Sequence, residues 1–461
     1  MGNYSAPSLI SFRLDQPSTE WRKPISVTSA SLLLLFVIPI ILQGSLLHPK
    51  FARWRLGRWV RLGMTPMNVY LGLKAPLEYV IVPVERCGGF NFCLCIWGTQ
   101  LALKALLFGL SPGYLQGRCW TRDEAALTPN EKLYTLQPPH QKDDYSWKEV
   151  AQWTLKHTLS PRGIQYGWGL KSELNQRTFG QVLKRLYKVH VLSLIATGYC
   201  VASRDYGSPT KVLVGLGLPE TIWTTIAAEF LASLSFPAYL LSWFDIGYTY
   251  LSLNAYMISW LHRDKGLPVP ESIMEWLDPR LYTVIFHSPH TVSSLNELWS
   301  KGWHQFLRAD LIFFGARPAI SLAKKAGLSK NAQKICSLFA VFILSGILHE
   351  IYVLSSVSTK ISLTSYLRET PFPGTFFFFM IQPLGILVEP LIIPWIPKLV
   401  GGGTLWVWLF SLLMITPYRK ALLGPFGAID QALPPLPQWP VYSFFVPGTL
   451  YRLQGSIQVD F

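Results

Sequence analysis

One apolar run, residues 335–357, is long enough to cross a bilayer as a helix and carries a His-Glu pair near its middle. The core of a bilayer takes roughly 20 apolar residues of helix. An ionisable group at that depth costs about 2.5–3.5 kcal/mol on insertion scales, so it usually marks a functional site. On a helix, one narrow polar face would hold Ser345, His349, Tyr352 and Ser356.

The histidine on this face has two interpretations. His349 could take a proton from a hydroxyl group away from bulk water, as a general base does. It could also hydrogen-bond a neighbouring helix for packing alone, and this run does not decide between the two. Glu350 comes directly after His349, which on a helix points it about 100° away. We therefore do not expect Glu350 to orient the imidazole automatically.

The composition indicates that the whole chain is a polytopic membrane protein. Half of the 461 residues are hydrophobic and 15% are charged, whereas a soluble domain carries about 25% charged residues. Hydropathy predicts about seven to eleven membrane segments. The clearest are residues 25–47, 91–110, 189–202, 221–243, 335–357, 376–396 and 404–416, and weaker candidates are 65–83, 244–261, 306–323 and 442–451. The predicted fold class is therefore an all-α polytopic membrane protein.

The basic excess indicates topology rather than a nucleic-acid partner. The formal net charge is +15, and residues 48–62 alone hold five Lys or Arg and no acidic residue. Loops of this kind stay on the cytosolic side, so we expect this loop and the polar segment 111–188 to face the cytosol. We predict one membrane domain, 1–461, with 111–188 as a cytosolic cap. Its surroundings would be membrane lipids, in the endoplasmic reticulum.

The six cysteines predict neither a metal site nor a disulfide framework. Cys93 and Cys95 lie inside an apolar run, and no C-x-x-C element occurs in the chain. Cysteines in such a run are most simply small apolar side chains. We therefore predict no metal and no bound cofactor.

A second group of polar residues lies in the segment 293–308. Ser294 and Glu297 have the spacing of a capping box that would begin a helix. A continuous helix would have an apolar face with Trp299, Trp303, Phe306 and Leu307 and a polar face with Glu297, Lys301, His304 and Arg308. Taken alone, the pattern is typical of an interfacial helix with tryptophan anchors and a solvated charged face.

The two segments form a spaced pair, in which Trp-x(3)-Trp-His is followed about 45 residues later by Ser-Gly-x-x-His-Glu. The residues concerned are Ser294, Leu295, Leu298, Trp299, Trp303 and His304 in the first segment, and Ser345, Gly346, His349 and Glu350 in the second. The pair resembles the membrane-bound O-acyltransferases, specifically their wax-synthase-like branch, in which Phe usually stands where this chain has Leu298. The resemblance covers residues 279–356. The Trp-His-Gln form is similar to fungal acetyltransferases of terpenoid and meroterpenoid biosynthesis.

The resemblance implies a multi-helix bundle and roles for individual residues. His349 would be the catalytic base and His304 its partner at the family's Asn/His position. Coenzyme A is a polyanion that needs cations, for which the candidates are Lys301, Arg308, Arg317, Arg162 and Lys171. Further substrate contacts are expected from Trp299, Trp303, Ser345 and Tyr352.

The implied function is an acyl-CoA-dependent O-acyltransferase. Its preferred reaction would transfer acetyl from acetyl-CoA to a hydroxyl of a lipophilic terpenoid or meroterpenoid in secondary metabolism. Wax-ester synthesis from long-chain acyl-CoA and a fatty alcohol is the alternative. A transporter would be indicated by paired broken spans in corresponding halves, and a terpene cyclase or prenyltransferase by an Asp-rich cluster. The sequence contains neither pattern.

Overall fold

The computed structural model describes residues 17, 22–25, 36–51, 54–82, 84, 88–111, 119–122, 134–137, 145–159, 175–274, 277–370 and 372–424. Within this part, five helices are long and apolar enough to cross a membrane by length and composition. They are α4 (Gly88–Leu110), α6 (Phe179–Asp205), α8 (Ile222–Lys265), α13 (Lys330–Val357) and α15 (Gly374–Ile392). The predicted class, an all-α polytopic membrane protein, is confirmed.

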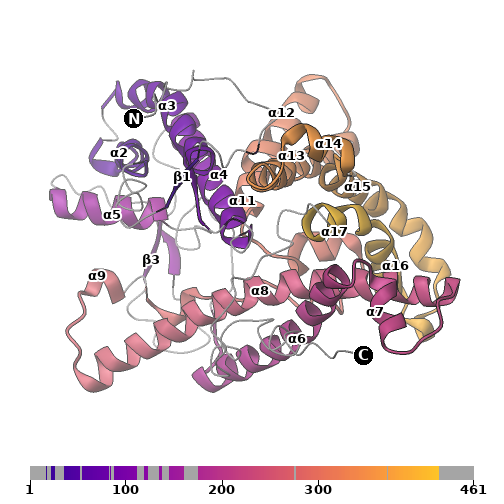
Figure 1. Cartoon of the computed structure of the whole chain (residues 1–461). Coiled ribbons are helices and arrows are strands. Elements are labelled where there is room, and N and C mark those ends of the chain that lie inside the picture. The colour runs from indigo at the N-terminus through magenta and orange to yellow at the C-terminus, as the bar shows by residue number, and fades with distance from the viewer. Residues whose placement is uncertain are drawn as a thin grey trace, which may run out of the picture.

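The other described elements are shorter or less apolar. The helices are α2 (Ile38–Ser45), α3 (Gly57–Glu78), α5 (Trp147–Leu159), α7 (Pro209–Gly215), α9 (Glu271–Met274), α10 (Leu295–Glu297), α11 (Arg308–Leu311), α12 (Arg317–Lys325), α14 (Leu363–Glu369), α16 (Gly403–Met414) and α17 (Thr416–Leu423). Strands β1 (Lys23–Pro24) and β2 (Tyr79–Val80) pair in parallel, and β3 (Cys119–Arg122) and β4 (Tyr134–Gln137) pair antiparallel. Figure 1 shows α6 alongside α8 on the lower side, with α13 and α15 at the upper right.

Helix α8 corrects one prediction, because the expected spans 221–243 and 244–261 form a single helix of 44 residues. It begins after Thr221, whose side chain accepts the backbone N–H of Thr224, and ends at Gly266 with φ of 70°. The helix continues without interruption through Pro237 and through the polar point at Asp245. At about 1.5 Å per residue the helix is roughly 66 Å long, which exceeds one bilayer core of about 30 Å.

The remaining predicted spans have mixed outcomes. Residues 376–396 and 404–416 correspond to α15 and α16. The first part of the span 65–83 falls in α3, which ends at Glu78 and is followed by β2, and 306–323 are divided into α11, the π-helical turn Ile312–Ala316 and α12. The span 25–47 lies partly, and 442–451 wholly, outside the described residues, and so does about half of the predicted cap 111–188.

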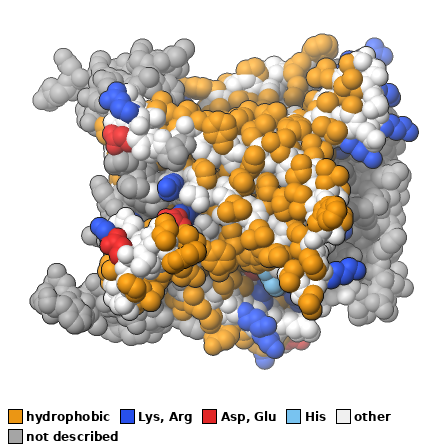
Figure 2. Space-filling model, turned by 90° about the vertical axis from the view of Figure 1, so that its right-hand side faces the viewer, with side chains coloured by type: hydrophobic (Ala, Val, Ile, Leu, Met, Phe, Trp, Pro, Cys, Tyr) orange, Lys and Arg blue, Asp and Glu red, His pale blue; other side chains and the backbone are white. Residues whose placement is uncertain are grey.

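The outer surface is apolar over a broad area, as expected for contact with lipid tails. On the face shown in Figure 2, hydrophobic side chains dominate and Lys and Arg gather toward the margins. Leu391 on α15 is 72% exposed and Leu413 on α16 is 71% exposed. Such side chains are stable in hydrocarbon, whereas buried polar groups need partners inside the protein. The polar residues within the bundle therefore indicate where its internal bonds lie.

Helices α3 and α4 pack closely through small residues. A Cβ atom added to Gly98 would lie 2.5 Å from the carbonyl oxygen of Gly72, and one added to Gly72 would lie 2.8 Å from the backbone nitrogen of Ala102. Membrane helices commonly approach at such residues, because close contact gives van der Waals energy that lipid tails do not supply. This contact holds α4, which borders the site described below.

We predict that Gly98→Ala destabilises the protein and Gly247→Ala does not. The new methyl group at Gly98 would meet the Gly72 carbonyl oxygen and the Pro76 ring of α3, and overpacking of this kind typically costs about 1–3 kcal/mol. Gly247 lies in α8 with nothing within 4 Å of an added Cβ, so Ala there gains helix propensity of about 1 kcal/mol. Thermal unfolding of the two purified variants in detergent compares them directly. Equal changes in the unfolding temperature of the two variants would contradict the close packing of α3 and α4.

Candidate active site

Helix α13 separates an inward polar face from an outward apolar face. Ser345, Tyr352 and Ser356 are buried in the protein, and His349 lies on the same stripe. On the opposite face the exposed residues are Ile343, Ile347 and Ile351. The 3.6-residue period of the sequence therefore places the imidazole toward the interior and leaves the isoleucines for lipid.

The imidazole of His349 is oriented by its own helix. Its Nδ1 lies 2.7 Å from the carbonyl oxygen of Ser345 and 3.5 Å from the Ser345 hydroxyl. A carbonyl oxygen can only accept a hydrogen bond, so Nδ1 carries the proton and the neutral ring has its lone pair on Nε2. The ring of Phe379 packs against the imidazole with centroids 4.2 Å apart. The bond and the aromatic ring together fix the direction of the basic nitrogen.

Glu350 points away from His349 and binds a different helix. Its Oε2 accepts the backbone N–H of Phe376 at 2.9 Å and also the hydroxyl of Thr375. These groups belong to the first turn of α15, where unpaired N–H groups and the helix dipole favour a carboxylate. The adjacent His and Glu thus have separate partners, one within α13 and one on α15.

The predicted capping box before His304 is only half formed. The Ser294 hydroxyl accepts the backbone N–H of Glu297 at 3.0 Å, which begins α10. The Glu297 carboxylate binds the backbone N–H and the hydroxyl of Ser293 instead of returning to Ser294. The start of the helix was therefore predicted at the right residue, but one of the two expected bonds uses a neighbour.

The continuous helix predicted through residue 308 is wrong. A π-helical turn, Leu298–Gly302, follows α10, and Trp303 then has an extended backbone with φ of −83° and ψ of 166°. The Trp303 N–H closes the turn by donating to the Leu298 carbonyl at 2.7 Å. Because the helix ends at Gly302, His304 does not share a helical face with the charged residues around it.

The two cations proposed beside His304 lie elsewhere. Lys301 is exposed on the π-helical turn. The Arg308 guanidinium donates to Oε1 of Gln305 at 3.1 Å. Neither residue borders the cavity described below. We expected these two side chains next to the reacting groups because we predicted a continuous helix. Since the helix ends at Gly302, that predicted position is wrong.

His304 lies among aromatic rings. Its ring centroid is 5.7 Å from that of Phe244, 5.9 Å from Trp303 and 6.0 Å from Phe306. Burial, with a smaller contribution from the nearby His349, lowers the pKa of His304 to about 3. The ring is therefore neutral at physiological pH, and its buried Nδ1 has no hydrogen-bond partner within the described residues. An unpartnered polar atom at such a place is available to a ligand.

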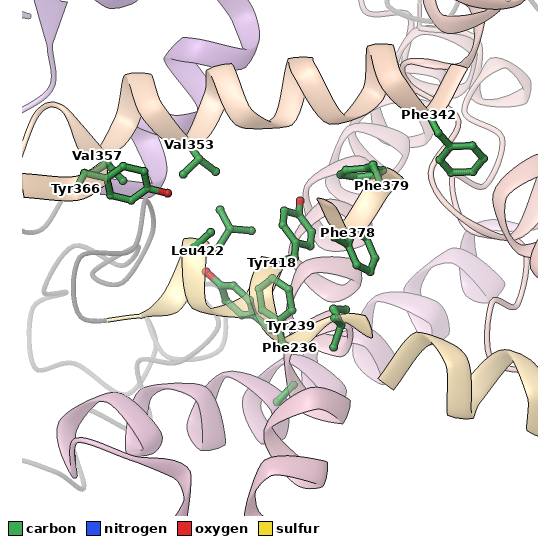
Figure 3. Close-up of a cluster of buried hydrophobic side chains, with 13 residues drawn as sticks. Phe236, Tyr239, Phe342, Val353, Val357, Tyr366, Phe378, Phe379, Tyr418 and Leu422 are labelled. Atoms are coloured by element: carbon green, nitrogen blue, oxygen red, sulfur yellow. The ribbon is translucent and has the colours of Figure 1, made fainter. Parts of the chain in front are cut away.

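A cavity of about 1060 Å³ joins the two segments. Trp299, Trp303 and His304 from one segment and His349 and Tyr352 from the other all lie on its wall. The rest of the wall is rich in aromatic rings, namely Phe92, Phe244, Phe286, Phe306, Phe378, Phe379 and Tyr418. In Figure 3 the rings of Phe378, Phe379 and Tyr418 lie together below α13, on the side toward α8. The sequence-predicted pair of histidines therefore shares one apolar chamber.

One part of the cavity wall is charged, and the sequence reasoning missed it. Arg185 on α6 makes a two-pronged ion pair with Asp245 on α8, with Nη2–Oδ2 at 2.7 Å and Nε–Oδ2 at 3.0 Å. Lys188 on the next turn of α6 and Lys104 near the end of α4 also border the cavity. These ends of α4 and α6 are the ones joined by the predicted cytosolic segment. Lys104 and Asp245 could have been noticed as ionisable residues inside apolar runs.

The described residues offer donors for organic ligands rather than for a metal ion. Within them, no group of three His, Cys, Asp or Glu side chains gathers in a way that could hold a metal. Cys93, Cys95, Cys200 and Cys336 are free thiols. The polar groups on the cavity wall are instead imidazoles, indoles, amides and cations, which suit an anionic and partly apolar molecule.

The comparison with protein families agrees with this geometry. Residues 282–379 match the model of the membrane bound O-acyl transferase family. The matched stretch contains the Trp-His segment, all of α13 and Phe379, the ring that packs on His349. The match supports a membrane-bound O-acyltransferase. A search of curated protein sequences finds no match, and the wax-synthase-like branch and the fungal terpenoid acetyltransferases stay predictions.

We predict that Ser345→Ala changes acyl-transfer activity by less than about threefold. His349 is oriented by the backbone carbonyl of Ser345, and a contact of 3.5 Å to the hydroxyl is too long for a good hydrogen bond. Initial rates in membranes that contain equal amounts of each protein would measure the effect. A loss of more than tenfold would show that the hydroxyl acts on the substrate or on the imidazole.

Proposed function

We propose that this chain is a membrane-bound O-acyltransferase that moves an acyl group from acyl-CoA to a hydroxyl of a lipophilic alcohol. The observation that carries the proposal is the state of His349. Its Nδ1 is bonded to a carbonyl, so Nε2 is a free base on the wall of a cavity shared with His304. The family match over residues 282–379 supports the same class of reaction.

In the proposed reaction, His349 Nε2 removes the proton of the alcohol as the alcohol oxygen attacks the thioester carbonyl carbon. The tetrahedral intermediate then expels the coenzyme A thiolate, and the imidazolium of His349 returns the proton to that sulfur. The new C–O bond replaces the C–S bond, and no net proton is gained or lost. The hydrogen bond to the Ser345 carbonyl also stabilises the positive charge that His349 carries between the two steps.

His304 would act on the oxygen of the thioester. A neutral imidazole has one N–H to donate, and the low pKa of His304 keeps it in this form. Donors of this kind that stabilise an oxyanion contribute about 2.7–4 kcal/mol where they have been measured. The Trp303 indole, on the same part of the wall, is a second donor for the developing charge.

The charged end of the cavity would hold the phosphates of the donor. Lys104, Arg185 and Lys188 replace Lys301 and Arg308 as the candidates, because they border the cavity and the latter two do not. The bidentate pair with Asp245 fixes the Arg185 guanidinium, which leaves further N–H groups for an anion. This end meets the predicted cytosolic segment, from which coenzyme A esters would enter an enzyme of the endoplasmic reticulum.

The aromatic part of the cavity would hold the acceptor alcohol. Its volume of about 1060 Å³ lies just above the roughly 300–1,000 Å³ usual for ligand sites. Rings from several helices surround a broad chamber, which favours a bulky polycyclic skeleton over a single alkyl chain. We therefore propose acetyl transfer from acetyl-CoA to a terpenoid or meroterpenoid alcohol as the preferred reaction, as the Trp-His-Gln form of the motif suggested.

We predict that His349→Ala lowers turnover about 10²- to 10⁴-fold, which is the usual contribution of a positioned base. Membranes containing the protein would be incubated with radiolabelled acetyl-CoA or palmitoyl-CoA and a panel of terpenoid and fatty alcohols. His262→Ala is the matched control, because His262 binds the Leu267 carbonyl at the far end of α8. Retention of more than a tenth of the activity by His349→Ala would contradict the general-base role.

We predict that Lys188→Gln raises KM for the acyl-CoA donor about tenfold or more and leaves KM for the alcohol unchanged. A hydrogen bond to a charged group contributes about 1.5–3 kcal/mol, which corresponds to roughly 10- to 150-fold in affinity. Lys184→Gln is the control, because Lys184 is an exposed lysine one turn earlier on α6 that does not border the cavity. Equal donor KM values in the two variants would remove the phosphate role of Lys188.

A further inference from the structure

Helix α15 carries a buried polar stripe that neither the motifs nor the proposed chemistry accounts for. Thr375, Gln382 and Glu389 recur at intervals of seven residues and so share one face. Gln382 is 1% exposed and Glu389 is 6% exposed, in a helix whose outer face is apolar. A carboxylate or amide inside such a helix is costly unless it is paired, and it usually has a function.

The Glu389 carboxylate binds the beginning of the segment that carries His304. Its Oε2 accepts the backbone N–H of Leu295 at 2.6 Å and its Oε1 faces that of Asn296 at 3.3 Å. Ser294 takes the next N–H, that of Glu297. The first three N–H groups of α10 are therefore bonded, two of them by a residue about 94 positions further along the chain.

Gln382 holds the same segment one turn further on. The indole N–H of Trp299 donates to Gln382 Oε1 at 3.1 Å. The Gln382 amide nitrogen in turn donates to the Phe378 carbonyl at 3.1 Å, which sets the orientation of the amide. Two hydrogen-bonded points therefore attach the segment 295–299 to α15, just before the chain turns at Gly302 toward Trp303 and His304.

The same helix is attached to α13 at its other end. Glu350 caps the first turn of α15 through Phe376, and Phe379 packs on the His349 ring. One helix thus contacts both histidine-bearing segments, first at Glu350 and His349 and then at Trp299 and Leu295. The position of His304 relative to His349 depends on these bonds, because the chain between the two residues crosses α11, α12 and the start of α13.

We propose that Glu389 is a positioning residue that anchors the segment 295–304 on α15 and so sets the place of Trp303 and His304 opposite His349. It does not border the cavity, and it contacts the segment through the backbone N–H groups of Leu295 and Asn296. The effect on turnover rests on the proposed function, whereas the anchoring of the segment does not.

The test compares Glu389→Gln with the wild type in two measurements. The glutamine amide places an N–H₂ donor against one of the two backbone N–H groups, so that hydrogen bond is lost. Peptides covering 295–304 should therefore exchange hydrogen for deuterium about tenfold faster or more. Misplacement of about 1 Å can cost on the order of 10²-fold in rate, so we expect kcat to fall about 10- to 100-fold. KM for both substrates should change by less than about threefold, since the cavity wall keeps its residues.

Glu149→Gln is the matched control, because Glu149 is likewise a carboxylate that accepts a backbone N–H at the start of a helix, that of Ser146 before α5. It should leave exchange in 295–304 and kcat unchanged. If Glu389→Gln does not fold, Glu389→Asp replaces it and should give smaller changes in the same directions. Unchanged exchange in 295–304, or faster exchange with wild-type kcat, would overturn the proposal. Failure of the proposed function would appear differently, as absence of turnover in the wild type with every donor and alcohol.

Discussion

Polar groups within a membrane bundle must find hydrogen-bond partners inside the protein, and the site depends on this constraint. Lipid tails offer no partner, and an unpaired buried group costs several kcal/mol. His349 binds a carbonyl of its own helix, Glu350 the first turn of α15, and Glu389 the first turn of α10. Each bond satisfies a polar group, and together they connect the two histidine segments through α15. The geometry of the site is therefore a consequence of how these groups are paired.

The fold class and the polar stripe of α13 could be predicted because both rest on local patterns. Long apolar runs are readable from composition, and a 3.6-residue period places Ser345, His349 and Tyr352 on one face. The inward direction of this stripe and the outward isoleucines agree with that reading. For Glu350 the sequence predicted only that its carboxylate does not orient the imidazole. Its actual partner, the start of α15, lies on a helix that no local pattern connects to it.

The features that could not be predicted depend on contacts between distant parts of the chain. The helix before His304 ends at Gly302 through a π-helical turn, although the spacing of Trp299, Trp303 and the charged residues favoured continuation. Periodicity predicts which residues would share a face if a helix forms. It does not predict where the helix ends, because tertiary packing determines that. Lys188, on the cavity wall, was likewise inseparable by sequence from the basic residues that set membrane topology.

The most direct test of the central claim is a cryo-EM structure with a non-hydrolysable thioether analogue of the acyl-CoA donor. We expect the analogue to bind in the cavity. Its sulfur and its acyl carbon should lie next to His349 Nε2 and the ring of His304. The phosphates should lie against Lys104, Arg185 and Lys188. An analogue bound outside this cavity, or with its acyl carbon beyond the reach of His349, would contradict the shared site of the two histidine segments.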